Sequence, residues 1–388
     1  MMSFNLTRAR IRIILTGTSF YICGYFGFLK NIDLIKNKER SITTRRNITS
    51  SDGYYEKYVR YTNSQMHFYT SNMLRHIAFL KVHKAGSSTM QNIFFRFGLK
   101  YNLNVFVPNT GNFLRSRYQI IPLKGNDHYD IIACHTYYKN FRLFNILPSD
   151  AVKIGIVREP LSRMISSAYF YRDMSRFPYL VRVPDSKFIN NLVNYPERFE
   201  RKYFSFTRNA MARDFSFPYY QPSDKAHIQK YLNKLNEEIL LVLVLERFNE
   251  SLVLMKRILN WRLTDIIYLA SNTHEHEQVF LNETEVANFK MTNFLDFEIY
   301  QYFLKVLESK LQQVSKGFNE EVTFFKIVLE KVSFFCTDYH QTERQTLVIE
   351  GFDRGDDIIV SETDCKLMQR SEQHFISSLR KNLLRLQR

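Results

Sequence analysis

The chain has 388 residues, of which 45% are apolar and 15% aromatic, so it can bury a large core and is not a disordered polymer. Its net charge of +16 indicates anionic partners. Much of that excess lies in residues 1–50 and in the tail Arg380–Arg388, so the charge does not require a nucleic-acid groove, and we expect no nucleic-acid partner.

An uncharged apolar run, Ile13–Leu29, lies near the start of the chain. Its seventeen residues are at the short limit for crossing a bilayer, and three arginines in residues 8–12 favour a cytosolic N-terminus. A cleaved signal peptide is the alternative, but no convincing small-x-small cleavage site is present. We therefore expect a cytosolic tail (1–12), a transmembrane signal anchor (13–29), a polar stem (30–70) and a lumenal domain (71–388).

Three glycosylation sequons fall on the expected lumenal side, at Asn47, Asn249 and Asn282. Asn47 is the favoured acceptor because it lies in the polar stem. For Asn249 the alternative is a structural role, since asparagine is a preferred N-cap and a helix is expected to begin there.

Four short runs rich in Val, Ile and Leu are expected to be strands: His76–Val82, Tyr129–Cys134, Val152–Val157 and Leu240–Glu246. Nearly continuous apolar runs are typical of parallel strands that are covered on both faces. Helical patterns are expected at Thr89–Phe97, Leu161–Arg172, Ser251–Asn260 and Phe294–Val314. This alternation predicts a three-layer α/β domain around a central, mainly parallel sheet.

A polar corner joins the first predicted strand to its helix. The glycine lets the backbone approach a ligand closely, three hydroxyls follow it, and the start of the helix offers free N–H groups and a favourable dipole. It is not a Walker loop, because the lysine precedes the glycine. An ordinary turn with a capping serine is the alternative. The predicted anion-binding residues are Lys84, Ala85, Gly86, Ser87, Ser88 and Thr89.

A second corner follows the third predicted strand, which ends at Arg158. Pro160 suits the first turn of a helix, and Ser166 follows Arg158 by eight residues. Arginine can bind a phosphate with two hydrogen bonds, which a helix hydroxyl can complete. A surface arginine paired to Glu159 is the alternative. Two such corners predict a nucleotide that carries phosphates at two separate positions.

The cysteines suit an oxidising compartment. Cys336 and Cys365 flank a polar, charged loop and could form a disulfide, whereas Cys134 lies in an apolar run and is expected to be a buried small hydrophobe. No cysteine or histidine spacing indicates a metal site, so none is expected.

The two corners together resemble the signature of sulfotransferases that use 3′-phosphoadenosine 5′-phosphosulfate. The resemblance extends to the galactose-3-O-sulfotransferase family, which includes cerebroside sulfotransferase, through FLKVHKAGSSTMQNIFFRFG, VREPLSRMISSAYFY, RNAMARDF and LVLERFNESLVLMKRILNWRLTDIIY in that order. It covers most of residues 75–335 and is weak after residue 340. Gly86 stands where many members have alanine.

The resemblance implies a P-loop-like sulfotransferase fold and a single-pass type II protein of the Golgi membrane. It implies transfer of a sulfuryl group, without a metal, to the 3-hydroxyl of a terminal β-galactose on a glycolipid or glycoprotein. Lys84 and its loop would stabilise the departing 5′-phosphate, and Arg158 with Ser166 would hold the 3′-phosphate.

For the acceptor hydroxyl, the resemblance points to His135 at the end of the second strand as the base, and histidine titrates near neutral pH. A structural role for this strand-end histidine is the alternative. His83, inside the first corner, is a further catalytic candidate that could position donor or acceptor. Lys81 is a weaker candidate that could be a strand-end lysine facing solvent. Arg208, Asn209 and Trp261 are the positions considered for the acceptor.

Three alternatives stay open from the sequence. The acceptor could be another glycan hydroxyl, such as that of a uronic acid in a glycosaminoglycan. The chain could also be a catalytically silent, membrane-tethered binder of acidic glycans. A nucleotide kinase is disfavoured by the missing Walker pattern. The sequence does not distinguish a lipid-linked from a protein-linked galactose and does not indicate an oligomeric state.

Overall fold

The structure is a computed structural model, and it describes residues 60–62, 65–67, 72–125, 127–173, 178–200, 205–270, 278–338 and 346–386. The chain divides into two units, Met1–Ser50 and Ser51–Arg388. The first unit lies outside the described residues, and with it the predicted tail and anchor, much of the predicted stem, and Asn47. Within the described ranges, no helix combines the length and the apolar character that crossing a membrane requires.

A five-stranded sheet lies at the centre of the second unit, with the strand order β4-β5-β3-β6-β7 and every neighbouring pair parallel. Its strands are β3 (Ile77–Phe79), β4 (Val105–Phe106), β5 (Ile131–Ile132), β6 (Val152–Val157) and β7 (Leu241–Val244). The predicted parallel sheet is therefore confirmed. Each predicted run contains one strand, and β6 has the predicted bounds. The two-residue strand β4 was not predicted, because it is too short to form a pattern.

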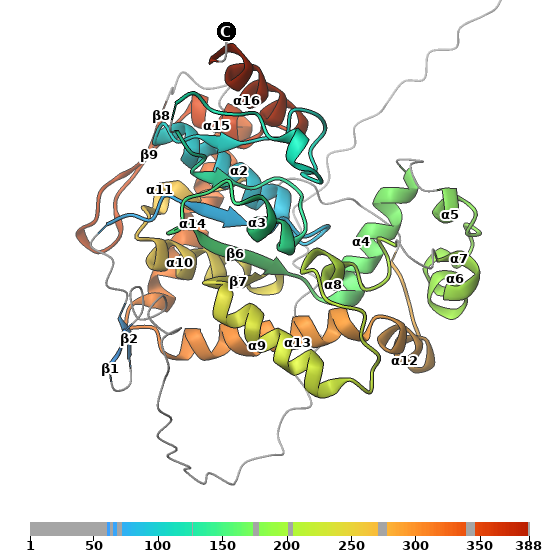
Figure 1. The fold of residues 1–388 in the computed structure, drawn as a ribbon. Helices are drawn as coiled ribbons and strands as arrows, with labels where there is room; N and C mark the ends of the chain where they lie inside the picture. The colour runs from blue at the N-terminus through green and yellow to red at the C-terminus, as the bar shows by residue number, and fades with distance from the viewer. Residues whose placement is uncertain are drawn as a thin grey trace, which may run out of the picture. The chain divides into compact units, whose positions relative to one another are not determined.

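Helices cover both faces of this sheet (Figure 1). On one side are α2 (Ser87–Lys100), α10 (Phe248–Leu259), α11 (Leu263–Ile266) and α14 (Phe318–Asp338). On the other are α3 (Tyr138–Phe144), α8 (Ala210–Asp214), α9 (Lys225–Glu238) and α13 (Phe294–Gln312). This is the predicted three-layer arrangement, and the right-handed hand of parallel crossovers explains why α2 and α9 cover opposite faces.

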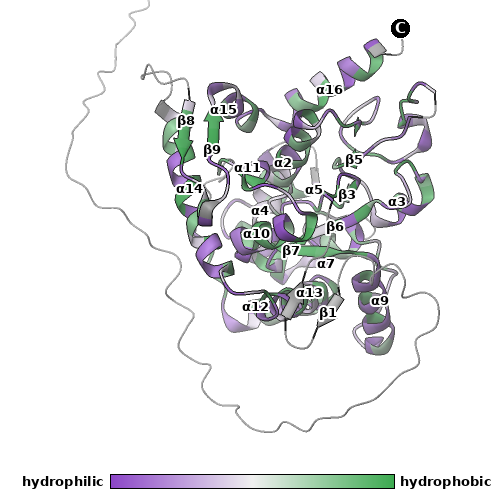
Figure 2. Cartoon of the chain, turned by 90° about the vertical axis from the view of Figure 1, so that its left-hand side faces the viewer, coloured by the Kyte–Doolittle hydropathy of each residue, from purple (hydrophilic) through white to green (hydrophobic). Residues whose placement is uncertain are grey.

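Burial of the strands on both faces explains their composition. All four residues of β7 are buried, and five of the six in β6. Figure 2 shows these strands as hydrophobic, whereas α9 mixes hydrophobic and hydrophilic residues because one side of it meets solvent.

A smaller apolar cluster lies beside the main core. It is built by α4 (Pro160–Asp173), α5 (Pro178–Val181), α6 (Phe188–Asn194), α7 (Pro196–Phe199) and α12 (Glu283–Thr292). Met164, Leu192 and Phe289 are buried in it. Because α4 follows Arg158 directly, this cluster supports the second polar corner.

The C-terminal part adds a hairpin of β8 (Thr346–Ile349) and β9 (Ile358–Ser361), followed by α15 (Glu362–Met368) and α16 (Glu372–Leu386). Both helices pack on α2. Near the N-terminal end of the unit, β1 (Arg60–Thr62) pairs with β2 (Gln65–His67).

Cys336 and Cys365 form the expected disulfide, with Cα atoms 5.3 Å apart. Cys134 is free and buried, and burial raises the pKa of its thiol to about 12.

Candidate active site

The first polar corner lies at the carboxyl end of β3, the edge where parallel α/β sheets bind ligands. Gly86 caps α2 in the left-handed conformation with φ 69°, and Lys84 is also left-handed with φ 61°. A Cβ atom on Gly86 would lie 2.6 Å from Cδ1 of Leu245. The loop is therefore a tightly packed turn, in which glycine avoids both strain and contact.

The three hydroxyls after Gly86 differ in their surroundings. Ser87 is buried, and its Oγ donates to the carbonyl oxygen of Val82 at 2.5 Å. Ser88 lies 3.1 Å from Nζ of Lys81. The Thr89 hydroxyl makes no hydrogen bond within the described residues. The Thr89 hydroxyl can thus meet an incoming anion, whereas Ser87 holds the loop and the Ser88 hydroxyl donates to Oε2 of Glu372 at 3.1 Å.

Lys81 is not the solvent-facing lysine that was considered, because only 1% of it is exposed. Its Nζ contacts Ser88 Oγ at 3.1 Å, Nε2 of His135 at 3.2 Å and Oε2 of Glu372 at 3.1 Å. An ammonium group has three N–H donors, so each contact can be a hydrogen bond. Lys81 is a central cation of the site.

His135 follows β5 and forms an isolated parallel bridge with Phe113. Its Nδ1–H donates to the carbonyl oxygen of Lys81 at 3.0 Å, which leaves Nε2 as the acceptor for the Lys81 ammonium. Burial, followed by the charges of Lys81 and His83, places the pKa of His135 well below its ordinary value. The imidazole is therefore neutral at physiological pH, with its basic nitrogen facing Lys81.

His83 lies beside His135 and is held by a different group. Its Nδ1–H and its backbone N–H both donate to Oδ2 of the buried Asp214, at 2.8 and 2.9 Å. Burial of Asp214 opposes its ionised form, but the charge and hydrogen bonds of His83 together with the charge of Arg213 outweigh this, so the pKa of Asp214 is lowered. The carboxylate fixes the ring orientation and tautomer of His83.

Lys84 and Arg158 connect the two polar corners. An Nη1–H of Arg158 donates to the carbonyl oxygen of Lys84 at 3.1 Å, and the Lys84 ammonium lies 3.8 Å from the ring centroid of Phe170. Burial, then the charges of Arg158 and Lys81, lower the pKa of Lys84 to about 8. Because the charges of Arg158 and Lys81 disfavour the charged form of Lys84, an anion bound beside Lys84 would be favoured.

The pairing of Arg158 with Glu159 that was considered does not form. The carboxylate of Glu159 instead accepts from the backbone N–H groups of Leu161 and Ser162 at the start of α4. Ser166 is half-buried on α4 and makes no hydrogen bond within the described ranges. The structure thus brings Arg158 to the first corner, whereas among the described residues no hydrogen bond links Ser166 to that corner.

A family model described as galactose-3-O-sulfotransferase matches residues 54–350. The chain belongs to this family. It is 27% identical to galactose-3-O-sulfotransferase 2 of Mus musculus over 251 residues, and this alignment covers 61% of the chain and 62% of the relative. It is 27% identical over 277 residues to galactosylceramide sulfotransferase of Homo sapiens, covering 68% and 64%. It is 30% identical over 210 residues to galactose-3-O-sulfotransferase 3 of Homo sapiens, covering 50% and 47%.

The chain thus spans less than two thirds of the length of these relatives. The expected family is confirmed, and the matched segment contains both polar corners, His83 and His135.

Of the positions considered for the family's acceptor, Trp261 belongs to the core. It is 3% exposed, its Nε1–H donates to the carbonyl oxygen of Leu74 at 2.8 Å, and its ring stacks on Phe97 with centroids 3.6 Å apart. Trp261 is therefore a packing residue.

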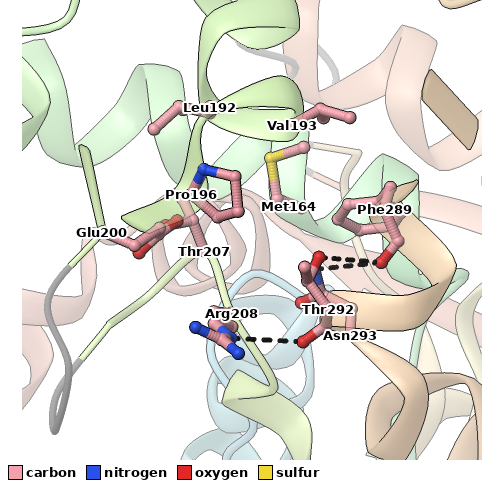
Figure 3. Close-up of a pocket in the computed structure, with 10 residues that line it drawn as sticks. All are labelled: Met164, Leu192, Val193, Pro196, Glu200, Thr207, Arg208, Phe289, Thr292 and Asn293. Atoms are coloured by element: carbon pink, nitrogen blue, oxygen red, sulfur yellow. Dashed lines mark hydrogen bonds between the residues drawn. The ribbon is translucent and has the colours of Figure 1, made fainter. Parts of the chain in front are cut away.

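Arg208 lines a small cavity beside Thr207, Thr292 and Asn293 (Figure 3). The Nε–H of Arg208 donates to the carbonyl oxygen of Thr292 at 3.3 Å, and the side-chain amide of Asn209 donates to the same oxygen at 3.1 Å. The cavity volume of about 10 Å³ has room for about one water molecule and not for a sugar. It is not an acceptor site in this conformation.

Two of the three sequon asparagines are described. Asn282 is exposed and caps α12, accepting from the N–H of Glu285 at 2.9 Å. Asn249 is not an N-cap, because α10 begins at Phe248 and is capped by Arg247. Its Oδ1 instead accepts from the hydroxyl of Tyr268 at 2.9 Å.

Among the residues that the structure describes, one group could hold a metal ion: His76, His128 and Asp130, whose ligand atoms lie within 4.8 Å of one another. It lies at the beginnings of β3 and β5, whereas the two polar corners follow the ends of their strands. The cluster is therefore not part of the candidate active site. A site that needs no metal stays a prediction.

Two contributors were missed by sequence reasoning, the carboxylates of Asp214 and Glu372. Asp214 lies in the motif RNAMARDF, so an acidic residue in a family motif was the available signal. Glu372 lies beyond the matched segment, and no sequence pattern marked it.

Proposed function

We propose that the chain transfers a sulfuryl group from 3′-phosphoadenosine 5′-phosphosulfate to the 3-hydroxyl of a terminal β-galactose on a glycolipid or glycoprotein. The observation that carries this proposal is the convergence of Lys81, Lys84, Arg158 and a neutral His135 at one edge of the sheet, in a chain of this family. The names of the relatives supply the acceptor class, galactose or galactosylceramide.

The donor carries the anions that this cluster of cations favours. Its 5′-phosphosulfate would lie against Lys84, the Thr89 hydroxyl and the free N–H groups at the start of α2. Its 3′-phosphate would be held by Arg158, with Ser166 completing the contact. The lowered pKa of Lys84 is consistent with a site in which the anion supplies the missing counter-charge.

The transfer is an in-line displacement in which the protein mainly orients the reactants and stabilises charge. The bond from sulfur to the 5′-phosphate oxygen breaks as the bond from sulfur to the galactose O3 forms. Negative charge grows on the departing phosphate, which Lys84 and the loop N–H groups stabilise. The proton of the galactose hydroxyl passes to His135.

His135 can accept that proton only at Nε2, because its Nδ1 already carries a hydrogen toward the carbonyl oxygen of Lys81. Nε2 lies 3.2 Å from the Lys81 ammonium, which donates to it. On donor binding, Lys81 would turn that N–H to a sulfuryl oxygen and release Nε2 for the acceptor hydroxyl. Lys81 would thereby couple binding of the donor to activation of the base.

The test uses the full-length chain in detergent with a sulfur-labelled donor. It is offered β-galactosyl glycolipid and glycoprotein acceptors beside desulfated heparan. Label at O3 of galactose is expected, and Lys84→Ala should reduce it by about three orders of magnitude. Lys230→Ala, an exposed lysine on α9, is the matched control and should keep full activity.

The remaining outcomes identify the alternatives. Label on the heparan alone would support sulfuryl transfer from the same donor but would show that the acceptor is a glycosaminoglycan and not galactose. Tight binding of 3′-phosphoadenosine 5′-phosphate without transfer to any acceptor would indicate a silent binder.

We also propose a Golgi membrane protein with a cytosolic N-terminus, anchored by residues 13–29, on the basis of the sequence and the family. Removal of N-linked glycans should increase electrophoretic mobility in wild type, and less so after Asn282→Gln, because Asn282 is exposed. A chain that carries no glycan would contradict the lumenal assignment.

A further inference from the structure

The C-terminal helix α16 places a carboxylate in the candidate active site. Oε2 of Glu372, its first residue, accepts from Nζ of Lys81 and from Oγ of Ser88, both at 3.1 Å. Oε1 accepts from the side-chain amide of Asn112 at 3.1 Å. Glu372 lies outside residues 54–350, so the family match contains the lysine and the serine but not their acidic partner.

Contacts remote from the carboxylate fix the start of α16. Phe375 packs on Phe95 of α2 with ring centroids 5.4 Å apart, and the amide of Asn92 donates to the carbonyl oxygen of Leu367 at 2.9 Å. The disulfide between Cys336 and Cys365 ties α15 to α14. Figure 1 shows α15 and α16 together beside α2. Glu372 is therefore held in place by packing on both sides of it in the sequence, and not by its ion pair alone.

The ion pair is itself mostly removed from solvent. The side chain of Lys81 is 2% exposed and that of Glu372 is 20% exposed. Burial opposes ionisation of Glu372, but the charge of Lys81 and the hydrogen bonds from Lys81, Asn112 and Ser88 outweigh it, so the pKa of Glu372 lies below its ordinary value. Among the residues that the structure describes, Glu372 is the one carboxylate paired with Lys81, and a buried ammonium that loses such a partner is strongly destabilised.

We propose that Glu372 is a positioning residue of the sulfuryl-transfer site, which holds the Lys81 ammonium in place between Ser88 and His135. This inference rests on the proposed function. The three N–H groups of Lys81 point to Ser88, His135 and Glu372. The N–H that now points to His135 can move to a sulfuryl oxygen only if the other two hydrogen bonds keep the ammonium in place. Glu372 supplies the charged one of these two.

The test compares wild type with Glu372→Gln, Glu372→Asp and the control Glu362→Gln in the full-length chain. Glu362 is a partly exposed residue of α15 that pairs with Lys366, so the control makes the same chemical change away from the site. We expect Glu372→Gln to lower kcat by about 100-fold, as removing one partner of a buried pair does. KM for the acceptor should change by less than about threefold. Glu372→Asp should restore part of the loss, and Glu362→Gln should match wild type.

A double-mutant cycle with Lys81→Met distinguishes positioning from a general structural role. If Glu372 acts through Lys81, adding Glu372→Gln to Lys81→Met should lower kcat no further. If Glu372→Gln lowers kcat by the same factor in wild type and in the Lys81→Met variant, the proposal is overturned. Binding of 3′-phosphoadenosine 5′-phosphate, measured by calorimetry, shows independently that each variant has kept its donor site.

Where Glu372→Gln does not fold, Asn112→Ala replaces it, because Asn112 is exposed and its loss frees only Oε1 of Glu372. We expect about a fivefold loss of kcat, as for one solvent-exposed hydrogen bond, and an unchanged kcat would overturn the proposal. If wild type transfers sulfate and the Glu372→Gln variant has the same kcat, this inference is rejected and the proposed function stands. A wild-type chain without transfer to any acceptor rejects the proposed function and this inference together.

Discussion

The imidazole rings of His83 and His135 lie face to face, with centroids 4.1 Å apart and planes inclined by 14°. Each ring is fixed by a different partner: His83 donates to Asp214, and His135 donates to the carbonyl oxygen of Lys81. The stacking and these two hydrogen bonds together fix the planes of both rings.

The first prediction separates the two histidines. His135→Ala removes the proposed base and should lower kcat by about 10²–10⁴-fold. His83→Ala removes the ring that orients it and should cost less. Steady-state kinetics, with bound 3′-phosphoadenosine 5′-phosphate as the folding control, measures both. A larger loss for His83→Ala than for His135→Ala would assign the base to His83 and Asp214.

The second prediction concerns pH. The pKa of Lys84 is lowered to about 8 in the free protein, so its charge is present below that pH and is lost above it. Affinity for 3′-phosphoadenosine 5′-phosphate should therefore fall as the pH rises from about 7 to about 9, a range in which an unperturbed lysine stays charged. Calorimetry at several pH values measures it. Lys84→Met should bind weakly with a much flatter pH profile, and an unchanged profile in that variant would assign the effect to another group.

The third prediction concerns the disulfide. Cys336→Ser together with Cys365→Ser should lower the free energy of unfolding by about 2–4 kcal/mol, because the bond closes a loop of 29 residues. Urea unfolding measures the change. Wild type in a reducing agent should behave like the double variant. Equal stability of the oxidised and reduced wild type would contradict a stabilising bond.

The fourth prediction tests the packing role of Trp261. Trp261→Ala should destabilise the fold by about 3–5 kcal/mol, as loss of a large buried aromatic does. Trp261→Phe retains most of the packing and should keep kcat and acceptor KM near wild type. A raised acceptor KM in the phenylalanine variant, at unchanged stability, would return Trp261 to the acceptor site.

Much of the fold could be predicted because its signals are local. Val152–Val157 is apolar throughout since it is buried on both faces, and it became β6 with the predicted bounds. The helix predicted at Phe294–Val314 runs from Phe294 to Gln312. The two-residue strand β4 could not be predicted, because its partner β5 and not its own sequence makes it a strand.

The sequence by itself determined the family, the parallel sheet and the two polar corners, because a glycine turn, an apolar strand and a basic residue at a strand end are written in consecutive residues. Only the tertiary structure decided the electrostatics of the site. Lys81 changes from a possible surface lysine to a buried central cation because Glu372, 291 residues away, comes to lie 3.1 Å from it. The pKa of a charged group and its interaction with a ligand depend on its solvent exposure and on its neighbours. Both are set by how distant segments pack.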